Sequence, residues 1–150
     1  MAEINKSIVK VEDLRITKLR TYLLSIIDVL VTNKKYQINA NMLSKDINNY
    51  SLDKIPVDFE VEKWITGTTI HRDVYSFRSR MNYSQDTITN LINVGFFEIF
   101  EQKINSNNNK GILPEIDKIQ SIQCLNCGSM TNANTNTAEF DIQIQIQYMI

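Results

Sequence analysis

The stretch AEFDIQIQIQY, residues 138–148, alternates apolar and polar side chains without a break. Successive side chains of a β-strand point to opposite faces of a sheet, so this period of two predicts a strand with one apolar and one polar face. The apolar face must lie against a core, which we expect helices to complete. The polar face carries the row Gln143, Gln145 and Gln147, which meets either water or a partner protein.

Shorter alternating stretches predict further strands at Ile38–Met42, Phe59–Thr66, Thr68–Arg80 and Ile119–Cys124. The two middle stretches are most simply interpreted as antiparallel strands joined near Gly67, with one long bulged strand as the alternative. Pro56 predicts a break before this part of the sheet. Residues 43–50 are ambiguous, and the Gly/Ser/Asn/Thr-rich residues 126–137 predict a mobile loop.

Two segments have the three- and four-residue apolar spacing of an amphipathic helix. The first lies between Val11 and Thr32, and it is followed by Asn33-Lys34-Lys35, which supplies two cationic residues. The second is expected to start at Ser84, whose hydroxyl can cap free amides, and to end at the polar loop 105–111. Its predicted buried face comprises Ile88, Leu91, Ile92, Phe96, Ile99 and Phe100, and extends toward Ile104.

This order of elements predicts an α+β fold. We expect one domain, residues 1–150, in which a largely antiparallel or mixed sheet of four to five strands packs against two main helices. The 16 basic and 17 acidic residues give a net charge of −1, which argues against a dedicated nucleic-acid binder. The chain has no apolar run long enough for a membrane span, and its start lacks the pattern of a signal peptide, which predicts folding in a reducing cytoplasm.

The motif Cys124-Leu-Asn-Cys127 is half of a zinc knuckle. A structural zinc site needs four ligands, and the chain has no other cysteine and a single histidine, His71, in a different segment. We therefore interpret the two cysteines as reduced thiols of a turn or a buried position. The alternative is a site completed by His71 and a carboxylate.

No residue pattern predicts catalysis. The run His71-Arg72-Asp73 is similar to a kinase catalytic loop, but no glycine-rich phosphate loop accompanies it. We interpret these three residues as alternating exposed positions of a strand. The sequence thus predicts no catalytic residue, no metal ligand and no cofactor, and we expect a protein that is not an enzyme.

A basic stripe is the remaining candidate site, because Arg72, Arg78 and Arg80 share one parity of a predicted strand. They are either ordinary exposed residues balanced by Asp73 and Glu60, or a contact with an acidic partner subunit or DNA phosphate. The candidate subunit or partner interface therefore consists of Arg72, Arg78, Arg80, Gln143, Gln145 and Gln147.

The order of segments resembles the tail terminator, or minor capsid, proteins of long-tailed phages and phage-tail-like bacteriocins of the clostridial type. The strand ending at Gly67, the strand containing Tyr75-Ser-Phe77 and the helix ending in Gly95-Phe-Phe-Glu-Ile-Phe100 are similar to that family's central unit. Ile112-Leu-Pro114 and the last two predicted strands also match its order of elements. The resemblance covers the chain from its first helix to Tyr148.

The resemblance implies a structural assembly protein that forms a ring, usually of six subunits, at the head-proximal end of the tail tube. Such a ring stops polymerisation of the tube and docks the head or a collar. The implied partners are further copies of the chain, the tail tube protein, the sheath protein as a further candidate, and the head–tail connector or collar. DNA would pass through the ring, and no membrane is involved.

The implied location is the tail of a virion or of a phage-tail-like particle, with assembly in the host cytoplasm. The alternative within the same particle is another tail-completion or connector protein. A different class is a small metal-binding protein, or a metal-dependent hydrolase, that uses His71, Cys124 and Cys127.

Overall fold

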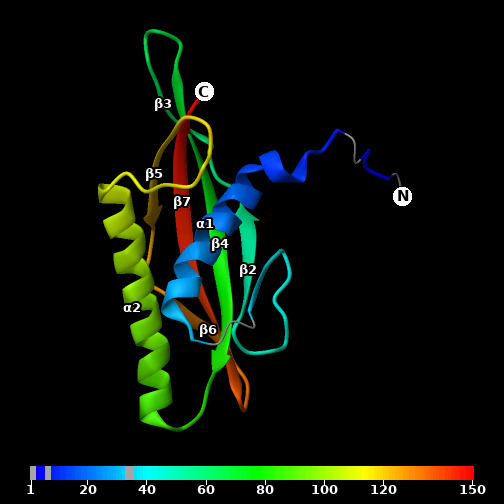
Figure 1. Cartoon of the computed structure of the whole chain (residues 1–150), viewed down its shortest axis with the longest axis vertical. Helices are drawn as coiled ribbons and strands as arrows, with labels where there is room; N and C mark the ends of the chain where they lie inside the picture. The colour runs from blue at the N-terminus through cyan, green and yellow to red at the C-terminus, as the bar shows by residue number, and fades with distance from the viewer. Residues whose placement is uncertain (1–2, 6–7, 33–35) are drawn as a thin grey trace.

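The computed structural model describes residues 3–5, 8–32 and 36–150. Figure 1 shows the long strands β4 (Thr69–Asn82) and β7 (Thr137–Met149) running along the long axis of the molecule, with α1 (Arg15–Leu30) and α2 (Thr87–Asn109) on one side of the sheet. The elements in chain order are the 3-10 helix η1 (Val11–Asp13), α1 (Arg15–Leu30), β1 (Gln37–Ala40), β2 (Asn49–Ile55), β3 (Glu60–Lys63), β4 (Thr69–Asn82), α2 (Thr87–Asn109), β5 (Ile119–Cys124), β6 (Ser129–Ala133) and β7 (Thr137–Met149). The chain is an α+β protein, as predicted. Residues 33–35, expected at the end of the first helix, lie outside the described residues.

The sheet has seven strands in the order β1-β2-β4-β7-β5, with β3 paired to the start of β4 and β6 paired to the start of β7. Among the strands of the described residues, β1 and β2 alone run parallel, so the sheet is mixed and largely antiparallel. The two antiparallel strands predicted around Gly67 are β3 and β4, and β2 ends immediately before Pro56. The expected number of four to five strands was too low, because β2 and β6 were not predicted.

The predicted mobile loop at residues 126–137 is wrong. Ser129–Ala133 forms β6, which pairs antiparallel with β7, and the amide of Asn134 donates to the carbonyl of Thr137 at 2.8 Å to close the hairpin. Every side chain of β6 is exposed. The polar composition fits this exposure, but the backbone is held in place by hydrogen bonds to the neighbouring long strand, and these bonds do not depend on apolar side chains.

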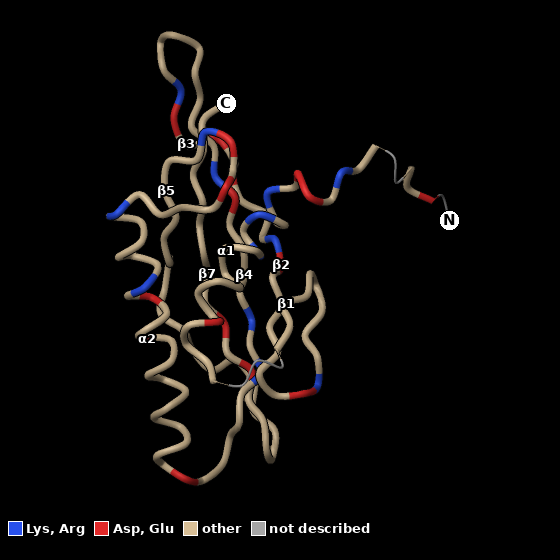
Figure 2. The backbone as a smooth tube through the Cα atoms, viewed as in Figure 1, with Lys and Arg blue, Asp and Glu red and all other residues tan. Residues whose placement is uncertain are grey.

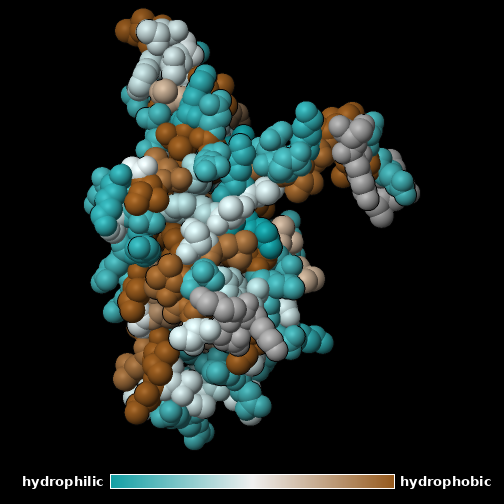
Figure 3. Space-filling model, in the orientation of Figure 1, coloured by the Kyte–Doolittle hydropathy of each residue, from teal (hydrophilic) through white to brown (hydrophobic). Residues whose placement is uncertain are grey.

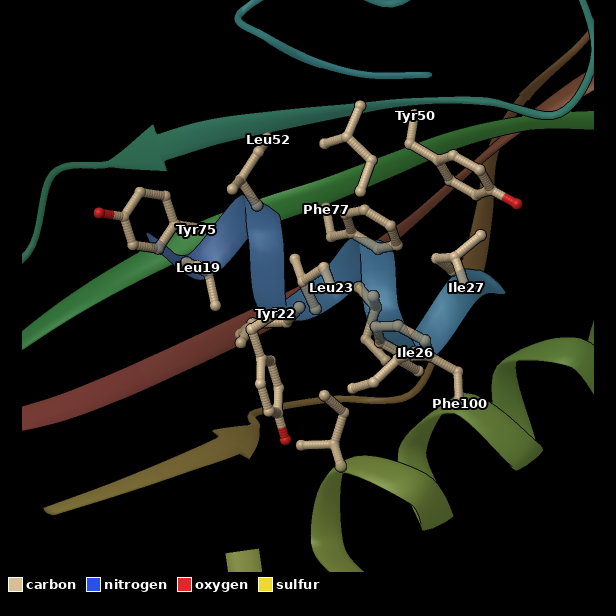
Figure 4. Packing of buried hydrophobic residues seen from close by; sticks show 14 of the residues in the cluster. Leu19, Tyr22, Leu23, Ile26, Ile27, Tyr50, Leu52, Tyr75, Phe77 and Phe100 are labelled. Carbon is tan, nitrogen blue, oxygen red and sulfur yellow. The ribbon is translucent and has the colours of Figure 1, made fainter. Parts of the chain in front are cut away.

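The core lies between the helices and one face of the sheet (Figure 4). From α1 it receives Leu19, Tyr22, Leu23, Ile26 and Ile27. The rings of Tyr50 and Phe100 both stack with the ring of Phe77, each with a centroid distance of 5.3 Å. The apolar face predicted for the last strand is confirmed, because Ala138, Phe140, Ile142, Ile144, Ile146 and Tyr148 are all buried.

Both ends of α2 differ from the prediction. Asp86 caps the helix, with its Oδ1 accepting from the amide of Ile88 at 3.3 Å, whereas the hydroxyl of Ser84 accepts from the amide of Asp86 outside the helix. The helix continues to Asn109, through part of the predicted polar loop. Two asparagines near this end of the helix form hydrogen bonds with the rest of the protein. The side chain of Asn107 donates to the hydroxyl of Tyr22 at 3.3 Å, and that of Asn108 accepts from the amide of Ile122 at 3.0 Å.

The buried face of α2 is rotated away from the predicted one. It comprises Asn93, Phe97, Phe100, Ile104 and Asn107. Four residues of the predicted face are exposed instead: Ile88, Leu91, Ile92 and Ile99 are 52–68% exposed. The helix has two apolar stripes at helical spacing, and the sheet takes the one that carries the larger aromatic area. An aliphatic stripe, defined by these four residues, consequently faces outward. None of the described helices is long and apolar enough to cross a membrane.

Candidate subunit interface

The six predicted interface residues lie on one face of two neighbouring strands. Tyr75 and Phe77 point into the core under the helices, so the even-numbered residues of β4 point to the opposite face. There Arg72 pairs directly with Gln147 of β7. The other pairs of this polar sheet face are Val74–Gln145, Ser76–Gln143, Arg78–Asp141 and Arg80–Glu139. The common parity predicted for the arginines is therefore confirmed.

Two of the arginines are used within the chain. Arg80 forms an ion pair with Glu139 at 2.8 Å and donates to the carbonyl of Ser44 at 2.7 Å, which leaves its side chain 11% exposed. Arg78 pairs with Asp53 at 2.5 Å. The expected balancing residues, Asp73 and Glu60, are not their partners. These two arginines join β4 to the strands on either side of it, so neither is a free basic group.

Arg72 is the most available of the three. Its Nε donates to the backbone carbonyl of Asp58 at 2.9 Å, in a solvent-exposed hydrogen bond, and no ion pair holds it among the described residues. Of the three predicted arginines, Arg72 is therefore the one that is available to contact an acidic partner.

The glutamine row is not uniform. Gln145 is only 4% exposed, although it shares its parity with the partly exposed Gln143 and Gln147. Ser51 and Ser76 are also buried on this face. Short or central side chains in a wide sheet are shielded by longer neighbours on the adjacent strands, which alternation along one strand does not reveal.

Asp73 contradicts the interpretation of residues 71–73 as alternating exposed positions. Its carboxylate is 4% exposed and accepts from Arg15 at 2.7 Å and from the hydroxyls of Tyr148 at 3.2 Å and Tyr75 at 3.4 Å. Burial, with Asp73 as a further cause, raises the pKa of both tyrosines. The sequence signal was present: Asp73 is an acidic residue on the apolar parity of β4. The carboxylate is surrounded by donors, and its geometry fits a structural tie between α1 and the sheet.

The cysteine turn is integrated into the sheet edge. The side chain of Asn126 accepts from the amide of Gln143 at 2.8 Å, and the amide of Gly128 donates to Glu101 at 3.0 Å. Burial raises the pKa of the Cys124 thiol to about 12, whereas Cys127 is exposed.

The structure does not bring His71 to this turn. Its ring lies against the rings of Phe59 and Tyr148, with centroid distances of 5.0 and 5.9 Å. Within the described part of the chain, no three or more His, Cys, Asp or Glu side chains are grouped as metal ligands would be.

Sequence reasoning missed an apolar groove beside the aliphatic stripe. It has a volume of about 630 Å³ and lies between the end of α1, the first half of α2, the start of β2 and the end of β4. Its main apolar lining residues are Leu30, Tyr50, Met81, Ile92, Phe96 and Ile99. Residues 87–97 of α2 carry no charge, and this half of the helix is tan in Figure 2. Hydrophobic side chains, brown in Figure 3, gather over the same part of the helix.

A second apolar surface lies at the tip of the β3–β4 hairpin, which projects beyond the rest of the molecule (Figure 1). The amide of Trp64 donates to the carbonyl of Thr68 at 2.8 Å, and that of Gly67 donates to Trp64 at 3.0 Å, so the turn is well defined. Gly67 has a φ of +91°, which favours glycine. At this tip Ile65 is fully exposed and Trp64 is 44% exposed.

No protein-family model matches this chain, and no curated protein is similar enough to count as a relative.

Proposed function

We propose that this chain is the subunit of a tail-terminator ring that caps the tube of a phage tail or of a phage-tail-like particle. The ring would stop growth of the tube and present a docking surface for the head or a collar. This role follows from the resemblance in the order of elements, and the surfaces of the isolated chain support it.

The observation that carries the proposal is the pair of uncovered apolar surfaces, the α2 stripe with its groove and the hairpin tip. Contiguous apolar surface on a soluble domain marks contact with another macromolecule. A ring subunit needs two different contact surfaces, because it meets one neighbour on each side through a heterologous interface. The chain has such surfaces at opposite ends of its long strands (Figures 1 and 3).

The polar sheet face supplies a different kind of surface. It consists of hydrogen-bonding and ion-paired side chains, with Arg72 and Gln147 adjacent in register at one end. A polar, hydrogen-bonding surface suits a partner that joins a preformed ring late in assembly, such as the head connector or collar, because such interfaces are wetter than permanent ones.

The test is deletion of the gene in a strain that produces the particle, followed by negative-stain electron microscopy. The proposal predicts tubes of variable and excessive length without a cap, and normal tails when the gene is supplied in trans. Tails of normal length that lack only the head or collar would identify a connector instead. Particles that are unchanged in length and attachment would contradict an assembly role.

A further inference from the structure

The hairpin tip and the apolar groove lie at opposite ends of β4. The hairpin turn ends at Thr68, one residue before β4 starts, and Asn82 at the end of β4 lines the groove. A strand rises by about 3.3 Å per residue, so Thr69 and Asn82 are separated by roughly 40 Å. The tip of a chain therefore cannot reach its own groove, and only another molecule can bring the two surfaces together.

We propose that the hairpin tip of one copy, residues 64–68, inserts into the groove of the next copy. The inference deepens the proposed function, because it names the contact between ring subunits, and its biological role rests on that proposal. A tip-to-groove contact is heterologous: each subunit offers its tip to one neighbour and its groove to the other. Repeated with a suitable rotation, such a contact closes into a ring.

The two surfaces match in charge. Residues 64–68 contain no ionisable side chain. Among the described lining residues of the groove the sole ionisable group is Tyr50, whose pKa is raised by burial, so its phenol stays neutral. Insertion would therefore bury no unpaired charge. Asn48 and Thr89 also line the groove and carry side-chain oxygens that could accept from the indole N–H of Trp64.

The size of the contact also favours a second copy in a ring over a stable dimer. The tip has one aromatic residue, the partly exposed Trp64, beside the fully exposed Ile65, so its side chains cover less than about 500 Å², since even a fully buried aromatic residue contributes only about 150–250 Å². A stable pairwise interface needs about 800 Å² from each partner. One contact is thus weak in solution, whereas a closed ring, in which every copy makes two such contacts, is stabilised by their repetition.

Photo-crosslinking between isotopically distinct copies tests the contact. Ile65 is replaced by p-benzoyl-L-phenylalanine in one batch, which is mixed with isotope-labelled wild-type chain at about 1 mM, where contacts of millimolar Kd are substantially occupied. The expected result is a crosslink from residue 65 of the light chain to residues 30–31, 81–82 or 89–99 of the heavy chain. The same probe at Ile112, which is about half exposed and lies away from the hairpin tip, should give no crosslink to those residues.

Two variants of the labelled chain make the test specific. Ile92→Asp places a charge in the groove and should reduce the crosslink at least tenfold, whereas Val94→Asp, about half exposed on the same helix but outside both the groove and the aliphatic stripe, should leave it unchanged. Circular dichroism confirms that both variants fold. Absence of any crosslink between copies would overturn the inference, and so would crosslinks confined to residues 3–11 or to the polar sheet face.

Failure here is distinguishable from failure of the proposed function. If gene deletion alters tail length but the crosslink is absent, the ring subunits meet through other surfaces. If the crosslink forms but deletion leaves the particles unchanged, the chain assembles through tip and groove but does not terminate tails.

Discussion

Arg15, the first residue of α1, donates from its Nε to the buried carboxylate of Asp73 at 2.7 Å, and its guanidinium lies 4.5 Å from the centre of the Tyr148 ring. These contacts tie the start of α1 to β4 and β7. The first helix is separated from β4 by the whole of β1, β2 and β3, so this pair holds together parts of the chain that are distant in sequence.

The first prediction concerns this pair. Arg15→Ala should lower the free energy of unfolding by about 1.5–3 kcal/mol, because it removes a charge-assisted hydrogen bond from a carboxylate that is itself out of water. The lower end is expected, since the Arg15 side chain is 42% exposed. Urea unfolding measures the change. Lys54→Ala is the control: its ammonium is 3.6 Å from Asp73 and more exposed, so its loss should cost less than about 1 kcal/mol. If the two variants lost equal amounts of unfolding free energy, the hydrogen bond from Arg15 would not be the dominant cationic interaction of Asp73.

A second prediction concerns Gly128, which follows the cysteine turn. A Cβ at this position would overlap the buried ring of Phe97, whereas a Cβ at Gly95 in α2 would meet no atom within 4 Å. Gly128→Ala should therefore cost about 1–3 kcal/mol through overpacking. Gly95→Ala should stabilise the protein by about 0.5–1 kcal/mol, because alanine is the better helix former. Thermal melts of the two variants should shift in opposite directions. A Gly128→Ala variant that melts like the wild type would mean that the ring of Phe97 can move aside at little cost in free energy.

Alkaline pH is the third test. Burial raises the pKa of Cys124 to about 12 and raises the pKa of Tyr50 and Tyr75 as well. These groups hold their protons more tightly in the folded protein than in the unfolded chain. Their contribution to the free energy of unfolding is therefore complete below the unfolded-state pKa values, which are 9.0 for cysteine and 10.0 for tyrosine. That contribution is lost as the pH rises through the folded-state pKa values.

The free energy of unfolding should consequently be flat near about pH 8 and fall above about pH 9, by up to about 1.4 kcal/mol per pH unit for each group. Urea titrations over this range measure it. Cys124→Ala should remove the part of the fall that begins between about pH 9 and 10. Iodoacetamide at about pH 8 should modify the exposed Cys127 well before Cys124. Equal labelling rates for the two thiols would contradict the burial of Cys124.

The sequence correctly predicted those parts of the fold in which the pattern of side chains within one strand or helix is enough to determine which side chains are buried. The alternation in residues 138–148 correctly assigned Ile142 and Ile144 to the core, because a long central strand must bury one face. The spacing of Leu19, Leu23 and Ile26 did the same for α1.

What could not be predicted depends on neighbours. The exposed strand β6 exists because β7 offers it backbone partners, and Asn107 is buried because Tyr22 is there to accept its hydrogen bond. In α2, packing against the sheet determines which of the two apolar stripes is buried, and the sequence of the helix alone does not contain that information. The candidate site was predicted to the same extent: parity correctly placed Arg72, Arg78 and Arg80 on one face, but the ion pairs of the last two arise between strands.

The fourth prediction uses the two faces of β7. Ile142→Asp places a carboxylate at a fully buried position with no partner, which costs several kcal/mol and should prevent soluble folding. Gln143→Ala, on the opposite face and partly exposed, should change the melting temperature little. We choose it over Gln145→Ala, which the alternation alone predicts to be harmless, because Gln145 is buried. Soluble, cooperatively melting Ile142→Asp protein would contradict the assignment of the core face.

The last prediction separates the arginines of the polar sheet face. Arg80→Glu would set a carboxylate against Glu139 at a position with little access to water, and would also free the carbonyl of Ser44. Breaking such a pair costs about 3 kcal/mol or more, so this variant should be strongly destabilised and cannot report on a partner.

Arg72→Glu loses only an exposed hydrogen bond to the carbonyl of Asp58, so it should fold with less than about 1 kcal/mol lost. Arg72 is the arginine of this face whose charge is not paired within the described part of the chain, unlike Arg78 and Arg80. Reversing its charge therefore tests whether an acidic partner binds the polar sheet face. If it does, particles carrying Arg72→Glu should assemble tubes of normal length but lose the head or collar in negative-stain images. Full attachment in this variant would show that the partner does not bind through Arg72, while leaving tube termination to be judged from the deletion.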